Sequence, residues 1–110
     1  MDNSNAASAI IAPEKLRDYL LSPTHPIGRY KSVFFVSLGY SQELWHILGR
    51  DLRGLLGGDA AQLELTEHGQ KVAYHGSITG PNGRSARVVT VWIILTGESV
   101  ARFVTAYPED

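Results

Sequence analysis

The chain of 110 residues contains no cysteine. It therefore has no disulfide framework and no thiolate ligand for a metal ion. It also has no apolar run of roughly 18 residues, the length that a membrane-spanning helix needs. The first eleven residues lack the basic start and apolar centre of a secretory signal. We therefore expect a cytoplasmic protein without a membrane partner.

The chain also has no large excess of basic or of acidic residues. The 10 basic and 11 acidic residues give a formal net charge of -1. Wholesale binding of duplex DNA needs many cationic contacts to phosphates and is disfavoured. A local cluster that grips one or two phosphates is not excluded. The chain also lacks a His-Glu-x-x-His motif and a glycine-rich phosphate loop, so we expect neither a metal nor another cofactor.

What the chain does contain is a change of hydrophobic period near Ala61. Before this residue the apolar positions recur at helical spacing, and after it they alternate as in strands. Short connections join the strands, which favours antiparallel neighbours. We predict an α+β fold with three N-terminal helices followed by a four-stranded antiparallel meander. Residues 1–12 are expected to form a flexible tail and residues 13–110 a single domain.

Proline, serine and glycine set the expected limits of the elements. The predicted helices run from Pro13 to Leu21, from Thr24 to Leu38 before a terminating Gly39, and from Ser41 to Gly57. The third helix is expected to bury four leucines: Leu44, Leu48, Leu52 and Leu55. The predicted strands are Gln62–Thr66, Gln70–Thr79, Ser85–Leu95 and Val100–Tyr107.

The turns between the strands also predict a register. A bulge at Gly83 and a tight turn at Gly97 set the alignment of the last three strands. The expected cross-strand pairs are Ile78–Ala86, Tyr74–Thr90, Thr90–Thr105 and Trp92–Phe103. One sheet face would then carry Tyr74, Thr90, Thr105 and Tyr107 with Trp92 and Phe103. The other face would form the core, with Val89, Val91, Ile93, Leu95 and Val104.

Two blocks of polar residues indicate phosphate chemistry. His25 precedes the second predicted helix, whose first turns carry Arg29 and Lys31, and helix N-termini attract anions. A histidine beside two cations suits acid–base work on a phosphodiester. The plain alternatives are a capping histidine and a solvated helix face. Near the end of the chain, Thr105 and Tyr107 share one strand face and could donate to phosphate oxygens, although both residue types are common in any strand.

Thr90 and two arginines could also help to bind a phosphate substrate. Thr90 matches Thr105 across the sheet in the predicted register. Arg87 and Arg84 flank the glycine-rich turn, where they could touch a backbone phosphate or serve as ordinary solubilising charges at a sheet edge.

Several sequence blocks occur together between Pro13 and Pro108. The most specific are His25-Pro26-Ile27-Gly28-Arg29 with Lys31, Thr79-Gly80-Pro81-Asn82-Gly83-Arg84, Thr90-Val91-Trp92, and Val104-Thr105-Ala106-Tyr107-Pro108. Together they resemble an uncharacterised bacterial domain family associated with toxins. The layout of helices, meander and a terminal Thr-x-Tyr-Pro strand is also similar to the barnase–EndoU–colicin–RelE superfamily of metal-independent ribonucleases.

This resemblance implies a metal-independent endoribonuclease that acts as a bacterial toxin component, with RNA as substrate and a cognate immunity or antitoxin protein as partner. The implied catalytic residues are His25, Lys31, Thr105 and Tyr107, and those implied to bind substrate are Arg29, Thr90 and Arg87. His25 would take the proton from a ribose 2′-OH, and the attack on phosphorus would leave a 2′,3′-cyclic phosphate. The alternative is a non-enzymatic protein-interaction module of a toxin–antitoxin or polymorphic toxin system.

Overall fold

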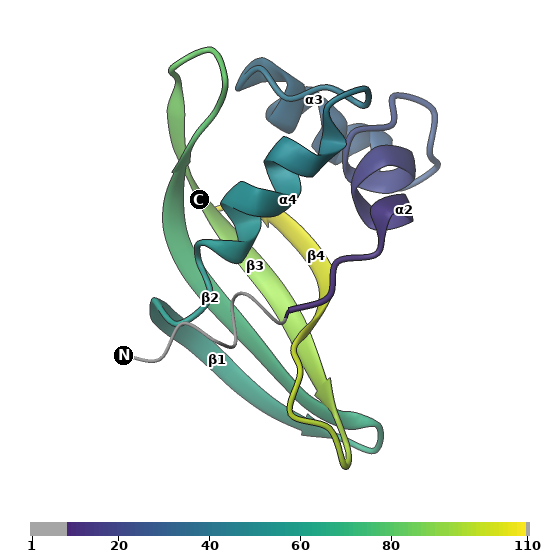
Figure 1. Cartoon of the computed structure of the whole chain (residues 1–110), viewed down its shortest axis with the longest axis vertical. Coiled ribbons are helices and arrows are strands. Elements are labelled where there is room, and N and C mark those ends of the chain that lie inside the picture. Colours follow the sequence, from purple (N-terminus) through teal and green to yellow (C-terminus); the bar gives the residue numbers. More distant parts are fainter. Residues whose placement is uncertain (1–8, 110) are drawn as a thin grey trace.

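The computed structural model describes residues 9–109, apart from the side chains of residues 59–63. Helices and an antiparallel four-stranded sheet form two layers, in agreement with the α+β class (Figure 1). The helical elements are α2 (Pro13–Lys15), the π-helical turn η1 (Leu16–Leu20), α3 (Arg29–Ser37) and α4 (Trp45–Arg53). The strands, adjacent in chain order, are β1 (Asp59–Thr66), β2 (Gly69–Thr79), β3 (Ser85–Leu95) and β4 (Arg102–Pro108).

The predicted order of three helices followed by the sheet is wrong. Within residues 9–109 the chain meets the sheet before its first helix, because Ile10 forms a parallel bridge with Arg102 of β4. The Ile10 N–H donates to the Ala101 carbonyl at 2.9 Å, and the Phe103 N–H donates to the Ile10 carbonyl at 2.9 Å. The first predicted helix is moreover divided into α2 and η1. Ile10 satisfies backbone groups that the edge strand β4 would otherwise expose. The sequence does not predict this bridge, because a single bridging residue produces no alternation of apolar and polar positions.

The structure describes the expected tail, residues 1–12, only from Ala9 onward. Residues 1–8 of it lie outside the described residues. Ala9 and Ile11 are buried in the same core as the helices and the sheet. The segment that leads to Pro13 therefore packs on the domain from Ala9 onward.

The second and third helices begin later than predicted. α3 begins at Arg29, because the Ser22 hydroxyl accepts the N–H groups of Thr24 and His25 and holds that stretch in turns. α4 begins at Trp45. Leu44, one of the four leucines expected in the core, precedes this helix and is 49% exposed.

Leu48 and Leu52 are the fully buried residues among the four leucines predicted for the third helix. Leu55 lies beyond the end of α4 and is partly buried. At the end of α3, Gly39 adopts a φ of 99°, the left-handed conformation expected of a glycine that ends a helix.

The register between β2 and β3 is as predicted, with Ile78 opposite Ala86 and Tyr74 opposite Thr90. The predicted register between β3 and β4 is correct only in part. The pairs between these strands include Trp92–Phe103, Val91–Thr105 and Thr90–Ala106. Val104 is thus an extra residue in β4, and this bulge replaces the predicted Thr90–Thr105 pair.

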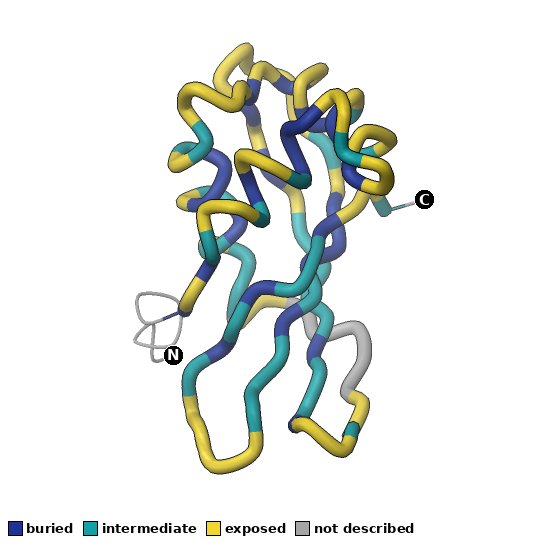
Figure 2. Tube along the Cα trace, turned by 90° about the vertical axis from the view of Figure 1, so that its right-hand side faces the viewer, coloured by how far each residue is buried: buried dark blue, intermediate teal, exposed yellow. Residues whose placement is uncertain are grey.

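The predicted core face of the sheet is the wrong one. The helices cover the face that carries Trp92 and Phe103, whose rings meet edge to face with centroids 5.3 Å apart (Figure 1). Of the five residues expected in the core, Val89 is buried, and the other four are partly buried: Val91, Ile93, Leu95 and Val104. Figure 2 shows buried segments where the helices meet the sheet. The turns at the end of the sheet farthest from the helices are exposed.

Candidate functional site

Three side chains from three separate elements meet beside β4. The Lys31 ammonium, on α3, donates to the Tyr19 hydroxyl at 2.6 Å and to the Thr105 hydroxyl at 3.1 Å. The hydroxyls of Tyr19, on η1, and Thr105, on β4, are themselves 3.2 Å apart. Each member thus contacts both of the others. We call Tyr19, Lys31 and Thr105 the hydroxyl–lysine cluster.

Gly28 allows η1 and the start of α3 to approach closely enough to form this cluster. A Cβ atom at Gly28 would lie 1.9 Å from the Tyr19 carbonyl oxygen and 2.9 Å from the Tyr19 ring. Both are shorter than any real contact of such an atom, and the carbonyl belongs to backbone that cannot rotate away. The glycine of the His25-Pro26-Ile27-Gly28 block therefore serves this contact.

His25 caps the turn that leads into α3. Its Nδ1 accepts the N–H of Ile27 at 3.0 Å and that of Gly28 at 2.9 Å, which is how an N-cap side chain satisfies free helical N–H groups. Because Nδ1 is the acceptor, Nε2 carries the hydrogen in the neutral ring. The imidazole meets the Tyr19 ring edge to face, with centroids 5.0 Å apart. His25 therefore lies next to the cluster and offers it an N–H donor.

A second lysine approaches from the first helical turn. Lys15 Nζ donates to the Val104 carbonyl at 3.1 Å, at the bulge of β4. It lies 5.9 Å from the centre of the Tyr19 ring, and Lys31 Nζ lies 5.1 Å from the same centre. Two ammonium groups thus lie close to the Tyr19 ring.

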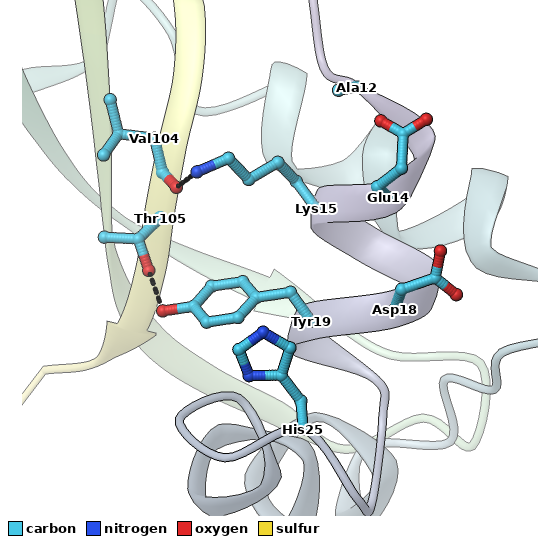
Figure 3. Close-up of a pocket in the computed structure, with 8 residues that line it drawn as sticks. All are labelled: Ala12, Glu14, Lys15, Asp18, Tyr19, His25, Val104 and Thr105. Atoms are coloured by element: carbon cyan, nitrogen blue, oxygen red, sulfur yellow. Dashed lines mark hydrogen bonds between the residues drawn. The ribbon is translucent and has the colours of Figure 1, made fainter.

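An open hollow of about 590 Å³ gives access to these groups. Figure 3 shows Lys15, Tyr19 and Thr105 extending toward one another across it, with His25 beside the Tyr19 ring. Its lining residues are Ala12, Glu14, Lys15, Asp18, Tyr19, His25, Val104 and Thr105. Asp18 is paired with Arg17 at 3.1 Å. The hollow is wide enough to admit a phosphate and its attached sugar.

The surroundings of Tyr19 change the acidity of its hydroxyl. Burial acts to raise the pKa of the phenol. The hydrogen bonds with Lys31 and Thr105 and the positive charges of Lys31 and Lys15 act in the opposite direction and outweigh it, so the pKa lies below its ordinary value. The hollow therefore contains a hydroxyl that loses its proton more readily than a free tyrosine.

The model of a domain of unknown function, DUF6883, matches residues 3–110. The chain belongs to this family. A chain of a contact-dependent growth inhibition toxin–immunity protein complex from Klebsiella pneumoniae 342 has a similar fold, with a TM-score of 0.74 and 15% sequence identity. The similarity covers 97% of this chain and 98% of that one. No curated protein sequence matches the chain.

The DUF6883 domain brings together three of the residues expected to be catalytic. Lys31 and Thr105 are hydrogen-bonded, and Tyr19 links them to His25. Tyr107 is elsewhere: it is 39% exposed and lines a separate pocket of about 80 Å³ with Glu64 and Lys71 among its walls. Thr105 and Tyr107 pair in regular register with Val91 and Val89, and their side chains nevertheless line different pockets.

The residues expected to bind substrate lie outside the hollow. Thr90 is fully buried and accepts the indole N–H of Trp92 at 2.9 Å. Arg87 pairs with Glu109 at 2.8 Å. Arg29 is exposed and donates to the hydroxyl of its neighbour Tyr30 at 2.7 Å, with its guanidinium over the Tyr30 ring.

Two residues of the hollow, Lys15 and Tyr19, were not predicted from the sequence. Their spacing of four residues was the available signal, because residues four apart lie on one helix face. The spacing does not predict that this helix face packs against β4, because the contacts of Lys15 and Tyr19 with β4 join segments far apart in the chain.

Among the side chains that the structure describes, no group of three or more His, Asp or Glu residues is placed to hold a metal ion. The described helices also include none that is long and apolar enough to cross a membrane.

Proposed function

We propose that this DUF6883 domain is a metal-independent endoribonuclease and a component of a bacterial toxin system. The 2′-OH of a ribose would attack the adjacent phosphorus and release a 2′,3′-cyclic phosphate. The observation that carries this proposal is the open hollow lined by Lys15 and by the hydroxyls of Tyr19 and Thr105, to both of which Lys31 donates. A phosphodiester in a pentacoordinate transition state needs such a set of donors.

The polar groups that line the hollow, and Lys31 bound to two of them, each suit one part of a phosphodiester. Lys31 and Lys15 can offset the charge that builds on the non-bridging oxygens. The Nε2–H of His25 can donate to one of these oxygens, since Nδ1 is held by the helix turn. The Thr105 hydroxyl can orient the phosphate. Charge-assisted hydrogen bonds of this kind are stronger than neutral ones.

The fold supports a place in a toxin system, since a chain of a growth-inhibition toxin–immunity protein complex shares it over nearly the whole length. By this analogy we also propose a cognate immunity protein as partner. The likeness is one of fold, and the chemistry of the hollow carries the enzymatic part of the proposal.

Cleavage of RNA by the purified protein tests the proposed activity. Total RNA should be cut in the presence of a chelator, and the fragments should end in a 2′,3′-cyclic phosphate. An oligonucleotide with hydrogen in place of the 2′-OH at the cut site should stay intact, because the nucleophile is missing. A requirement for added divalent metal, or equal cleavage of an all-deoxy strand, would contradict the proposal.

An exposed apolar stripe favours the interaction module as a second candidate function. The stripe follows α3 at spacings of three residues and consists of Ile27, Tyr30, Val33 and Val36, which are 62%, 70%, 72% and 52% exposed. No acidic residue occurs between Asp18 and Glu43, so a partner with acidic residues around an apolar patch would fit this surface.

Growth inhibition in bacteria that express the chain separates the two functions. For a ribonuclease, Lys31→Met should remove the inhibition, and Val33→Glu should preserve it. For an interaction module the reverse is expected, because Val33→Glu places a charge in the contact surface and Lys31→Met does not reach it.

A further inference from the structure

We propose that the phenolate oxygen of Tyr19 is the base that takes the proton from the ribose 2′-OH. This inference rests on the proposed ribonuclease function and assigns its proton transfer to a residue other than His25. Tyr19 lies at the centre of the hydroxyl–lysine cluster and lines the open hollow.

Two hydrogen bonds prepare the Tyr19 oxygen for the loss of its proton. An ammonium group has donors and no acceptor, so Lys31 must be the donor in its 2.6 Å contact with that oxygen. Thr105, 3.2 Å away on the other side, can also donate. Both contacts become stronger when the oxygen carries a negative charge. The cluster therefore favours a phenolate over a phenol.

His25 is less suited to the role of base in this conformation. A base needs a free lone pair, and the lone pair of Nδ1 is occupied by the N–H groups of Ile27 and Gly28. The other nitrogen, Nε2, carries the ring hydrogen in the neutral form. His25 would have to release both backbone contacts before it could accept a proton, and the turn before α3 would lose its cap.

The charges that face Tyr19 are mostly positive. Lys31 approaches from α3 and Lys15 from α2, while His25 contacts the ring from the turn before α3. The acidic side chains that line the hollow are Glu14 and Asp18, on the same helical segment as Tyr19, and Asp18 is paired with Arg17. Despite burial, the lysines and Thr105 hold the pKa of the phenol below its ordinary value.

In the proposed reaction, water completes the proton transfers. The proton of the 2′-OH moves to the Tyr19 phenolate, a bond forms between the 2′-oxygen and phosphorus, and the bond between phosphorus and the 5′-oxygen breaks. The 5′-oxygen takes a proton from a water molecule in the open hollow. The resulting hydroxide then removes the proton from Tyr19 and restores the phenolate for the next cycle.

Kinetics of two tyrosine variants test the assignment. Tyr19→Phe should lower the cleavage rate by about 10²–10⁴, the usual loss for a general acid or base. Tyr40→Phe is the matched control. Its hydroxyl is also hydrogen-bonded, to Asp51 at 2.6 Å, but it lies in the core away from the hollow. Tyr40→Phe should cleave at the rate of the unmodified protein. An active, folded Tyr19→Phe would overturn the inference and leave the ribonuclease function standing.

The ionisation of Tyr19 can be measured without any RNA. The difference in phenolate absorbance between the unmodified protein and Tyr19→Phe isolates this residue during a pH titration. Tyr19 should ionise at a lower pH than a free tyrosine, and Lys31→Met should move its titration to higher pH. Tyr40 does not interfere, because burial and the Asp51 contact raise its pKa.

The two measurements separate the outcomes. An unmodified protein that never cuts RNA contradicts the proposed function, whatever the titration shows. Tyr19 that ionises like a free tyrosine, or that is unaffected by Lys31→Met, contradicts the assignment of Tyr19 as base. A cleavage rate that rises with pH until Tyr19 is ionised, with the rise moved to higher pH in Lys31→Met, supports it. A rate that falls as Tyr19 ionises would overturn it in favour of an acid.

Discussion

The two ends of α3 are held by the same kind of contact but differ in what surrounds it. At the N-terminal end, a Cβ atom on Gly28 would lie 1.9 Å from the Tyr19 carbonyl oxygen. At the C-terminal end, a Cβ atom on Gly80 would lie 1.9 Å from the Leu38 carbonyl oxygen. In both places a glycine lets two backbones meet, one in η1 and the other in the turn between β2 and β3.

The C-terminal contact is complete in itself. The backbone N–H of Asn82 donates to the Leu38 carbonyl at 3.3 Å, and its side-chain amide donates to the Ser37 carbonyl at 3.0 Å. These bonds satisfy carbonyls that the end of a helix leaves free. The Arg84 guanidinium is 3.5 Å from the same Ser37 carbonyl. The polar groups at this end are used to hold the turn on the helix.

At the N-terminal end the contact leaves polar groups that face an open hollow. The backbone approach at Gly28 brings the Lys31 ammonium to the hydroxyls of Tyr19 and Thr105, two residues that line the hollow. Gly28 and Gly80 both mark a close approach of two backbones, so a glycine block in the sequence does not by itself indicate a functional site. Whether a functional site forms depends on which side chains the close approach brings together.

The largest expected effect comes from the removal of one cation at each end. Lys31→Met should lower the rate of RNA cleavage by about 10²–10³, the usual cost of a lost donor to a transition-state oxygen. Arg84→Met removes the same charge at the other end of α3 and should leave the rate unchanged. Steady-state cleavage of one RNA by both variants checks this. Equal losses would mean that α3 attracts RNA by charge alone.

The next largest effect concerns the two glycines. Gly28→Ala and Gly80→Ala introduce the same 1.9 Å clash, and each should lower the free energy of unfolding by about 1–3 kcal/mol, the usual cost of overpacking. Denaturant unfolding measures this loss. The rate per folded molecule should fall in Gly28→Ala alone, because only that clash moves Tyr19 away from Lys31. A slow, folded Gly80→Ala would show that both ends position the site.

The sequence was sufficient where one local rule decides the structure. The glycine of the turn at Gly83 set the β2–β3 register, with Tyr74 opposite Thr90 as predicted. The short connections set the antiparallel order of the strands. Lys31 and Thr105 were both expected in the site from their residue types, and the structure places them 3.1 Å apart.

The sequence failed where a contact joins distant segments. The bulge at Val104 has no glycine to reveal it, and it moved Thr105 out of register with Thr90. Thr90 itself lies on the face that the helices cover, where it accepts the Trp92 indole N–H. Both sheet faces carry apolar residues, so alternation alone could not decide which of them the helices cover.

Thr105→Val should have a smaller effect that reports on the N-terminal end alone. The change preserves the shape of the side chain and removes a hydroxyl that contacts both Tyr19 and Lys31. A hydrogen bond to a charged group is worth about 1.5–3 kcal/mol, so the rate should fall by about 10- to 100-fold. Thr105→Ser retains the hydroxyl and should cleave at nearly the original rate. A Thr105→Val variant as fast as the original would exclude this hydroxyl from the chemistry.

The smallest effect is expected at the C-terminal end, from Asn82→Ala. The change removes the amide donor to the Ser37 carbonyl and the acceptor that holds the Arg84 N–H at 2.9 Å. Asn82 is exposed, so water can replace both partners, and the free energy of unfolding should fall by only about 0.5–1.5 kcal/mol.

Asn82→Asp sharpens this last test. The carboxylate can still accept the Arg84 N–H, but it loses the donor and places a negative charge beside the C-terminus of α3, where the helix dipole disfavours it. Asn82→Asp should therefore be at least as destabilising as Asn82→Ala in denaturant unfolding. Both variants should cut RNA at the original rate per folded molecule, because the helix end that they loosen is not the one that carries Lys31. If the rate fell with stability in this pair, the two ends of α3 would be coupled, and the cluster at Tyr19 would depend on the whole helix and not on Gly28 alone.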